Sequence, residues 1–583
     1  MANAPKEDCT RFEIFMFQHD RLQQAAFSLI KESELPHILL KIGRLLLSKL
    51  EPEQINDRLF EIVNNLNSGF ELIDDTADRV QLVKLNMEAA RKSYVATAYS
   101  AALQYYTMAN RVLEHHGFLD YLWKHQRELG INFFKERALC EFLEGDHKIG
   151  EKCIEVAVSH TEKAIEKADI LNILIVHHTL HARYPEAIQA AKLALQALGI
   201  SLPEGDYENA RDKEIALVRE KMKNLEVSSL EKLPVMSNPE MLMVCKILIT
   251  MGPPCYRSYQ KLWSVIVPKV VGFTLSYGNI PQVGYSHTAF GGLLGWVDDD
   301  FSTAQKFSEA ATQLMTNVFR SPSDQSVFYL MIGSSIRHWF KHLKFGSQDY
   351  TDAYEIGLRS GNLQYAAYAF GHNMYCRFYQ GVPLDILISE TKGSLEFSQT
   401  RHNQWAIDLF EGGLKIFDAL ISDNVDKNAM NEWDDRSYLQ SVEDNHNIQV
   451  TCIYKVLKTF SLLLAGNYKE ALVLSDETEP IIYTVGTQGL LPWPEHVFAR
   501  FLILTALFAG EDKKQQDIWR IELNRILEKL RIWAKNGPDN FEHKYLLAKA
   551  EMAKIDGRFT EAIQLYGKAV DAAREGDFVQ WEG

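Results

Sequence analysis

Two histidine clusters have spacings that could bind a metal ion. His338 and His342 in the string RHWFKH lie four positions apart, which places both imidazoles on one face of a helix. A zinc-protease helix would also carry a glutamate directly after the first histidine, and no third ligand is indicated here. His177, His178 and His181 cluster similarly, with no carboxylate or cysteine at ligand spacing beside them. We therefore expect no metal site, and a capping or solvent-facing role for the His338 and His342 pair.

The sequence also lacks the motifs of the common catalytic classes. It has no G-x-x-x-x-G-K-[ST] phosphate loop, no H-R-D or D-F-G kinase motif and no G-x-S-x-G nucleophile elbow. The acidic run Asp298, Asp299 and Asp300 is predicted to cap a helix that begins near Ser302, since aspartate is a preferred N-cap residue. We predict that this chain is not an enzyme and has no catalytic residues and no cofactor.

The elements that would position these residues follow a repeated pattern. In DGRFTEAIQLYGKAV, the residues Ala562, Tyr566 and Ala569 are spaced to share one helix face, where small side chains let a neighbouring helix approach. An aromatic or bulky residue, a small residue three positions later and further apolar residues recur along the chain. The small residues that mark the other repeats are Ala102, Gly150, Ala187, Ala304, Ala366 and Ala471.

Several of these segments begin with a two-residue turn. The pairs are Gly145-Asp146, Gly361-Asn362, Gly466-Asn467 and Asp556-Gly557. Glycine or asparagine there supplies the left-handed residue that ends one helix before the next begins. Helix, short turn and a helix rich in small residues is the tetratricopeptide plan. The sequence therefore predicts an all-α fold, a tetratricopeptide-like right-handed superhelix.

Composition limits the environment and the partners of the protein. The chain has 583 residues, 46% of them hydrophobic, and a formal net charge of −15. Scattered negative charge argues against binding to nucleic acid, which needs a basic surface. Seven widely spaced cysteines without a C-x-x-C pair are typical of reduced thiols in a cytosolic protein. No apolar run is long enough to span a membrane and MANAPKEDCT has no signal-peptide core, so we expect a cytoplasmic protein.

The first ninety residues differ from the repeats. RFEIFMFQHDRLQQAAFSLI alternates apolar and polar residues before it becomes helical, which predicts a short strand followed by a helix over 20–30. A short strand against helices suggests the tail of a different domain. The predicted division is 1–90 for this segment and its linking helices, 91–230 for N-terminal repeats, 231–425 for degenerate central repeats and 426–583 for C-terminal repeats.

Several unusual strings resemble one family of signalling proteins. FMFQHDRLQQAAFSLI, RLFEIVNNLNSGFELI and SYGNIPQVGY are similar to segments of large bacterial multi-kinase proteins and fungal hybrid histidine kinases. In that family a kinase-like domain and a signal-transduction ATPase module precede a long tetratricopeptide-like region, and sensor and histidine-kinase domains follow it. The resemblance covers nearly the whole chain and implies that it corresponds to the end of the ATPase module and the helical region. It also implies that the N-terminal segment is a small partial winged-helix remnant of that module.

The resemblance also gives one nucleotide-binding hypothesis. In signal-transduction ATPases a histidine after the ATPase core can contact the nucleotide phosphates, and His19 in FQHDRLQQAA matches that position. The alternative is a histidine at a helix start beside Asp20, whose charge suits the helix dipole. Because the chain has no phosphate loop, the nucleotide role would require an ATPase core outside it.

Aromatic residues are dense between Cys255 and Tyr379, and most are expected to fill the gaps between helices. Helical arrays also use aromatic and basic residues on a concave face to bind partners, and we predict such a groove near Tyr285, His287, Arg337 and Trp339. The predicted function is a non-catalytic scaffold that binds protein partners, kinase or ATPase domains among them. The alternatives are a truncated piece of an ATP-dependent kinase and a stand-alone adaptor that acts on an ATPase in trans.

Overall fold

The computed structural model describes residues 29–421 and 435–582, and these residues form an all-α fold. No β-strand occurs in them, and one isolated β-bridge joins Val235 and Asn279. The chain divides into two compact units after Thr161. This boundary lies inside the predicted 91–230 segment, and the four-part division stays a prediction. The predicted strand near the N terminus, His19 and most of the helix over 20–30 lie outside the described residues.

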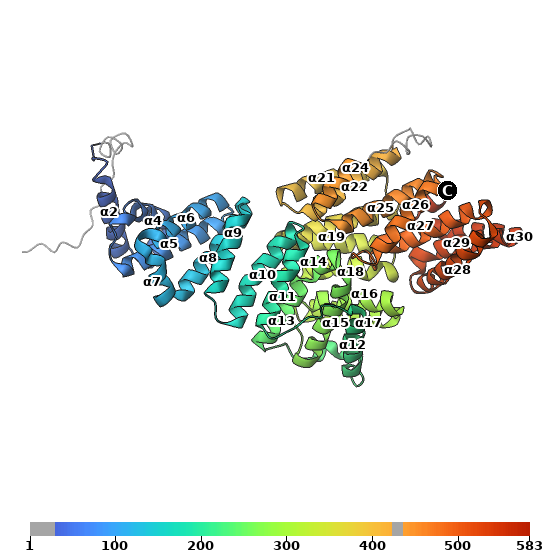
Figure 1. Cartoon of the computed structure of the whole chain (residues 1–583), viewed down its shortest axis with the longest axis horizontal. Coiled ribbons are helices and arrows are strands. Elements are labelled where there is room, and N and C mark those ends of the chain that lie inside the picture. Colours follow the sequence, from blue (N-terminus) through green and yellow to red (C-terminus); the bar gives the residue numbers. More distant parts are fainter. Residues whose placement is uncertain (1–28, 422–434, 583) are drawn as a thin grey trace, which may run out of the picture. The chain divides into compact units, whose positions relative to one another are not determined.

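The first unit consists of consecutive helices that pack as hairpins (Figure 1). The pairs α5 with α6 and α8 with α9 have the most extensive contacts. Asp75 and Asp146 begin α5 and α9 by accepting hydrogen bonds from the backbone N–H groups of Asp78 and Ile149. The elements of this unit are α2 Leu35–Lys49, α3 Pro52–Asp57, α4 Leu59–Ser68, η1 Phe70–Leu72, α5 Thr76–Val95, α6 Tyr99–Glu114, η2 His115–Gly117, α7 Phe118–His125, α8 Arg127–Glu144 and α9 His147–Ser159.

The second unit continues the hairpin plan over residues 162–582. Its most extensive contacts again join helices that follow each other, such as α18 with α19 and α29 with α30. Its helices are α10 Ala164–Leu180, α11 Tyr184–Ala197, α12 Tyr207–Lys221, α13 Pro239–Thr250, α14 Gly252–Ser258, α15 Gln260–Tyr277, α16 Val283–Asp298, α17 Phe301–Asn317, α18 Pro322–Ser335, α19 Leu343–Ser360, α20 Leu363–Tyr379, α21 Leu384–Thr400, α22 Gln404–Ile421, α24 Arg436–Asp444, α25 Ile448–Leu464, α26 Tyr468–Ile482, α27 Pro492–Leu507, α28 Lys513–Asn536, α29 Pro538–Ile555, α30 Phe559–Glu575 and α31 Val579–Glu582, with 3-10 turns η3 Val227–Lys232, η4 Arg337–Trp339 and η5 Phe508–Gly510.

The small residues of the repeat pattern lie in the helix interfaces. Ala102, Ala187, Ala366 and Ala471 are fully buried, and Ala304, Ala562 and Ala569 are nearly so. At Gly150 a Cβ atom would lie 2.4 Å from the ring of Phe142, so only glycine allows α9 to approach α8 this closely. Tyr566 is half-buried, and its hydroxyl donates to Glu551 of the preceding helix.

The turns between paired helices have the predicted left-handed conformation. Gly145, Gly361, Gly466 and Gly557 all have φ between 73° and 91°. These values are strained for residues with a Cβ atom, which explains why glycine recurs there. The predicted all-α helical-repeat fold is therefore confirmed.

The second unit departs from a simple array because late helices pack on early ones. Asn540 of α29 donates to the carbonyl oxygen of His338, which lies 202 residues earlier, at 2.8 Å. Tyr256 of α14 donates to the carbonyl oxygen of Gln488 at 3.0 Å. In an ideal solenoid each repeat contacts only its neighbours. Here the 3-10 turn η4 and α14 are instead held by segments from the C-terminal part of the chain.

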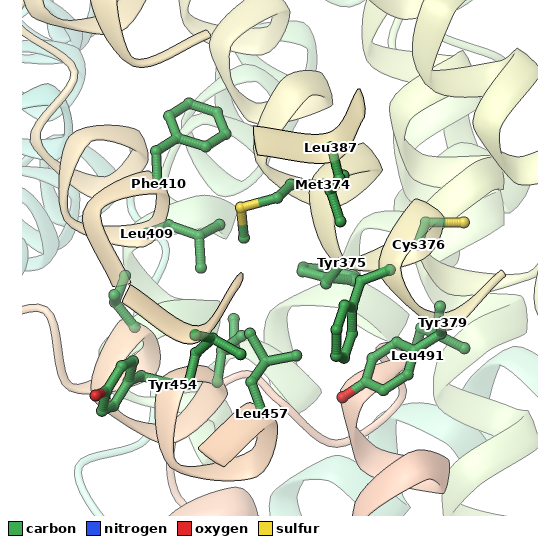
Figure 2. Packing of buried hydrophobic residues seen from close by; sticks show 14 of the residues in the cluster. Met374, Tyr375, Cys376, Tyr379, Leu387, Leu409, Phe410, Tyr454, Leu457 and Leu491 are labelled. Atoms are coloured by element: carbon green, nitrogen blue, oxygen red, sulfur yellow. The ribbon is translucent and has the colours of Figure 1, made fainter. Parts of the chain in front are cut away.

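A large apolar cluster fixes the centre of the second unit. Side chains from α20, α21, α22 and α25 point into one shared space, as Met374, Leu387, Leu409 and Leu457 do in Figure 2. All four are buried, with exposed fractions of at most 4%. This packing holds α20 in place, and that helix supplies one wall of the cavity considered next.

Candidate functional site

His338 and His342 do not share a helix face. His338 lies in η4 and is buried, which contradicts a solvent-facing role, and burial lowers its pKa to about 3. His342 is the N-cap of α19, so the predicted capping role is confirmed for this residue. Its Nδ1 accepts from the N–H of Lys344 at 3.1 Å, and its Nε2 donates to the carbonyl oxygen of Gly576 at 2.7 Å. Both ring nitrogens of His342 are therefore occupied.

The acidic run before α17 also acts as predicted. Asp300 is the N-cap of this helix and accepts from the N–H of Thr303 at 3.1 Å. Asp298 forms an ion pair with Arg219 at 2.8 Å. These contacts give the run a structural role.

The four residues predicted to line a partner groove do not form an exposed surface. Tyr285, His287 and Trp339 are buried, because large side chains fill the gaps between helices. Trp339 stacks on Phe541 with ring centroids 5.6 Å apart. Arg337 donates two hydrogen bonds to Asp349, at 2.6 and 2.8 Å. The partner groove stays a prediction, and of the four residues only Tyr285 borders the cavity described below.

The second unit contains a cavity of about 60 Å³ between α14, α15, α16, α18 and α20. Arg257 of α14 is the only charged side chain in its wall. The other residues that border it are aromatic, apolar or uncharged polar, namely Pro253, Tyr256, Trp263, Tyr285, Leu330, Met331, Ser334, Ser335, Tyr365, Tyr368, His372, Gln449 and Leu490. His372 adds no positive charge because burial, with Arg257 nearby, lowers its pKa to about 3.

Arg257 is buried without a carboxylate partner. It is 5% exposed, forms no ion pair with any residue that the structure describes, and its Nη1 has no hydrogen-bond partner there. Its guanidinium lies 3.9 Å from the ring centre of Tyr368 and 4.6 Å from that of Trp405. Burial opposes its charge, yet the nearby Tyr368 and Tyr184 oxygens prevail and raise the pKa of Arg257. The cavity thus holds one full positive charge that only aromatic groups offset.

Hydroxyl groups beside Arg257 can supply further hydrogen-bond donors. Tyr285 accepts from the Nε1–H of Trp263 at 3.1 Å, and Tyr368 accepts from Gln364 at 2.8 Å. A phenol that accepts one hydrogen bond can still donate its own proton. With these hydroxyls and the Nη1 group, the cavity is suited to binding an acceptor rather than to proton transfer, since it has no carboxylate and its histidine is neutral.

The sequence pattern that could have identified this site is an absence of acidic residues. Between Glu240 and Asp298 the chain has no aspartate or glutamate, while it carries Lys246, Arg257, Lys261 and Lys269. The density of aromatic residues in this segment predicts a packed core and does not single out Arg257. An arginine in the apolar string GPPCYRSYQ, within a stretch that has no acid between Glu240 and Asp298, indicates a buried charge in need of a partner.

Tyr184, whose oxygen acts on the pKa of Arg257, is connected to a buried carboxylate through Asn447, to which its hydroxyl donates at 2.8 Å. Asn447 in turn donates to Asp408 of α22, which also accepts from Asn445 at 3.0 Å and Gln404 at 2.7 Å. Asp408 is therefore separated from the Tyr184 ring by an uncharged amide. Burial raises the pKa of Asp408 to about 6 despite these hydrogen bonds.

The raised pKa of Asp408 predicts a pH dependence of stability. An aspartate has a pKa near 3.9 in an unfolded chain, so the folded state binds more protons between about pH 4 and 6. The free energy of unfolding should fall by about 2–3 kcal/mol as the pH rises through that window, and Asp408→Asn should remove this fall. Urea denaturation at pH 4, 5, 6 and 7 measures it. Asp385→Asn, at an exposed position of α21, changes the net charge equally and is the control. If the free energy of unfolding depends on pH in the same way in wild type and in Asp408→Asn, the prediction is contradicted.

Comparisons with known proteins relate this chain to a signalling kinase. No protein-family model matches it. A protein of Dictyostelium discoideum named hybrid signal transduction histidine kinase G is 24% identical over 412 residues. The match covers 64% of this chain but only 12% of the kinase, so the chain spans a small part of that protein's length. The chain is thus distantly similar in sequence to part of a hybrid histidine kinase.

Two solved structures align with most of the chain at low similarity. One is a Rap protein complexed with competence and sporulation factor, with 12% identity, a TM-score of 0.40, and coverage of 71% of this chain and 99% of that one. The other is aspartyl phosphate phosphatase F from Bacillus subtilis, with 12% identity, a TM-score of 0.32 and coverage of 73% and 96%. Both TM-scores lie below 0.5, which is too low to assign a shared function.

Among the described helices, none combines the length and the apolar character that crossing a bilayer requires.

Proposed function

We propose that this chain is a non-catalytic helical-repeat scaffold for protein–protein interaction and signal relay, and that it acts as a segment of a multi-domain signalling kinase or ATPase in the cytoplasm. The observation that supports this most is the match of 64% of the chain to 12% of a hybrid histidine kinase. The helical hairpins support it further, since such arrays present a continuous surface to partners. The absence of kinase and phosphate-loop motifs from the sequence agrees with a binding role.

The outer side of α30 has the character of a contact surface. Phe559 and Ile563 are 65% and 71% exposed, and with the half-buried Tyr566 and Val570 they follow spacings of four, three and four residues. That spacing forms one apolar stripe, which we call the α30 stripe. An apolar helix of a kinase or ATPase domain is the partner that this stripe fits, because such helices pack through the same spacing.

The proposal predicts that charges in the α30 stripe abolish partner binding and leave the fold intact. The double substitution Phe559→Asp and Ile563→Asp should reduce recovery of the partner at least tenfold, since buried aromatic and apolar anchors each contribute about 1–2 kcal/mol or more. Both side chains are mostly exposed, so the thermal unfolding midpoint should change little. The measurement is affinity purification from the native cells with quantitative mass spectrometry.

Gln564→Asp is the matched control, since it adds a charge at an exposed polar position of the same helix. Recovery of a kinase or ATPase by wild type and by Gln564→Asp, but not by the double variant, would support the proposal. Equal recovery by all three forms, or ATP hydrolysis by the purified chain, would contradict it.

A further inference from the structure

The cavity around Arg257 has an unbalanced buried charge, and burial of such a charge is unfavourable unless a partner arrives. Two half-buried arginines of the second unit are paired: Arg337 with Asp349 at 2.6 Å and Arg500 with Glu522 at 2.6 Å. Arg257 differs because its free Nη1 belongs to a side chain that borders the cavity. We propose that this cavity is a binding site for the carboxylate group of a small organic ligand, with Arg257 as its counter-ion.

The charge of the site favours a carboxylate over a phosphate. Arg257 provides a single positive charge, and His372 in the same wall is neutral. One carboxylate would neutralise it, whereas a phosphate dianion would leave a net negative charge in a buried site. Arginine is also the side chain whose planar guanidinium best matches a carboxylate.

Hydrogen-bond donors around the cavity can bind both oxygens of a carboxylate. Nη1 of Arg257 is the strongest hydrogen-bond donor, because a hydrogen bond from a charged donor to a carboxylate is about twice as strong as one between neutral groups. The hydroxyls of Tyr285 and Tyr368 each accept one hydrogen bond already and can donate to a second carboxylate oxygen. Gln449 is not available, because it accepts from Trp405 at 2.9 Å and donates to the carbonyl oxygen of Gly486.

The body of the ligand would occupy a neighbouring hollow. A second cavity of about 240 Å³ shares Pro253, Tyr285 and Tyr365 with the first, and so adjoins it. Val176, Ile249 and Val327 give its wall an apolar part, which suits the hydrocarbon body of an organic acid. The inner cavity of about 60 Å³ has room for a carboxylate and few further atoms. The carboxylate could belong to a free small acid or to the C terminus of a short peptide, and the experiment below separates the two.

This inference concerns the cavity alone and does not rest on the partner-binding function proposed above. It is tested by isothermal titration calorimetry on the purified full chain with propionate and benzoate, and with propionamide and benzamide as their neutral counterparts. A third pair is the peptide acetyl-Ala-Ala with a free and with an amidated C terminus. Inorganic phosphate at the same concentrations tests the preference for a carboxylate.

We expect at least one carboxylate to bind and its amide to bind at least tenfold more weakly. Propionate or benzoate binding identifies a free acid, and binding of the free-acid peptide alone identifies a peptide C terminus. Arg257→Met should abolish binding, and Tyr285→Phe, which keeps the arginine, should weaken it about five- to tenfold. Arg359→Met removes an equal charge at an exposed position of α19 and should leave binding unchanged.

Circular dichroism and thermal unfolding show whether each variant is folded. If Arg257→Met does not fold, Tyr285→Phe and the amide counterparts still decide the question. Equal binding of acid and amide, tighter binding of phosphate, no binding of any carboxylate, or full binding by folded Arg257→Met would each overturn the proposal.

Discussion

Replacing Lys544 with methionine is expected to lower the free energy of unfolding by about 3–5 kcal/mol, the usual cost of removing one partner of a buried ion pair. Lys544 of α29 and Glu495 of α27 form an ion pair and are almost fully buried, with side-chain exposures of 3% and 1%. The second oxygen of Glu495 has no hydrogen-bond partner in the described structure. Once the ammonium is gone, nothing compensates the carboxylate. Chemical denaturation monitored by circular dichroism at pH 7 measures the loss.

Two further variants decide whether the buried pair causes this loss. Lys544→Met combined with Glu495→Met replaces both charges with apolar groups, and should recover most of the stability. Lys513→Met breaks the exposed pair with Asp517 and should cost less than about 1 kcal/mol. A Lys544→Met protein as stable as the Lys513→Met protein would show that Glu495 does not depend on Lys544.

Local features of the fold could be predicted from the sequence because local physics produces them. The backbone freedom of glycine produces the left-handed turns at Gly145, Gly361, Gly466 and Gly557. Their positions just before the repeated small-residue helices predict them from the sequence. The helix cap at Asp300 follows from the hydrogen-bonding reach of a short acidic side chain. Each of these depends on residues only a few positions apart.

The candidate site could not be predicted in the same way because it is made by distant segments. The cavity joins Arg257 to Tyr368, and α25 reaches it through Gln449. No helical periodicity shows that these residues meet. His287 and Trp339, two of the residues predicted to line a partner groove, are buried for the same reason, since contacts such as that of Trp339 with Phe541 cover them.

The contacts between distant segments also give the second unit a physical means of relay. Asn540 donates to the carbonyl oxygens of His338 and Lys341 at 2.8 and 2.7 Å, so α29 holds the turn that precedes α19. Tyr256 and Gln260 both donate to the carbonyl oxygen of Gln488, at 3.0 and 3.1 Å. A ligand beside Arg257 would thus act on α14, which is tied directly to the segment before α27. Signal relay requires such a physical connection, and it also requires that the connected segments have two discrete conformations.

The buried Arg257 and the half-buried Arg337 should respond differently to the same substitution. Arg337→Met is expected to lower the free energy of unfolding by about 2–4 kcal/mol. It removes two hydrogen bonds and leaves Asp349, whose side chain is 7% exposed, buried without its partner. Burial already raises the pKa of Asp349, and Arg337 is what holds that rise back.

Arg257→Met should cost less than about 1 kcal/mol or increase stability, even though Arg257 is the more deeply buried residue. Its stacking on Tyr368 and Trp405 contributes about 2 kcal/mol or more, but the desolvation that methionine avoids costs several. No carboxylate is left behind. Parallel urea denaturation of the two variants and wild type at pH 7 measures the contrast. An equal loss of stability in both variants would mean that Arg257 has a partner within the protein and a structural role. The expected contrast would mean that the charge of Arg257 is kept at the expense of stability, and binding of a carboxylate explains why.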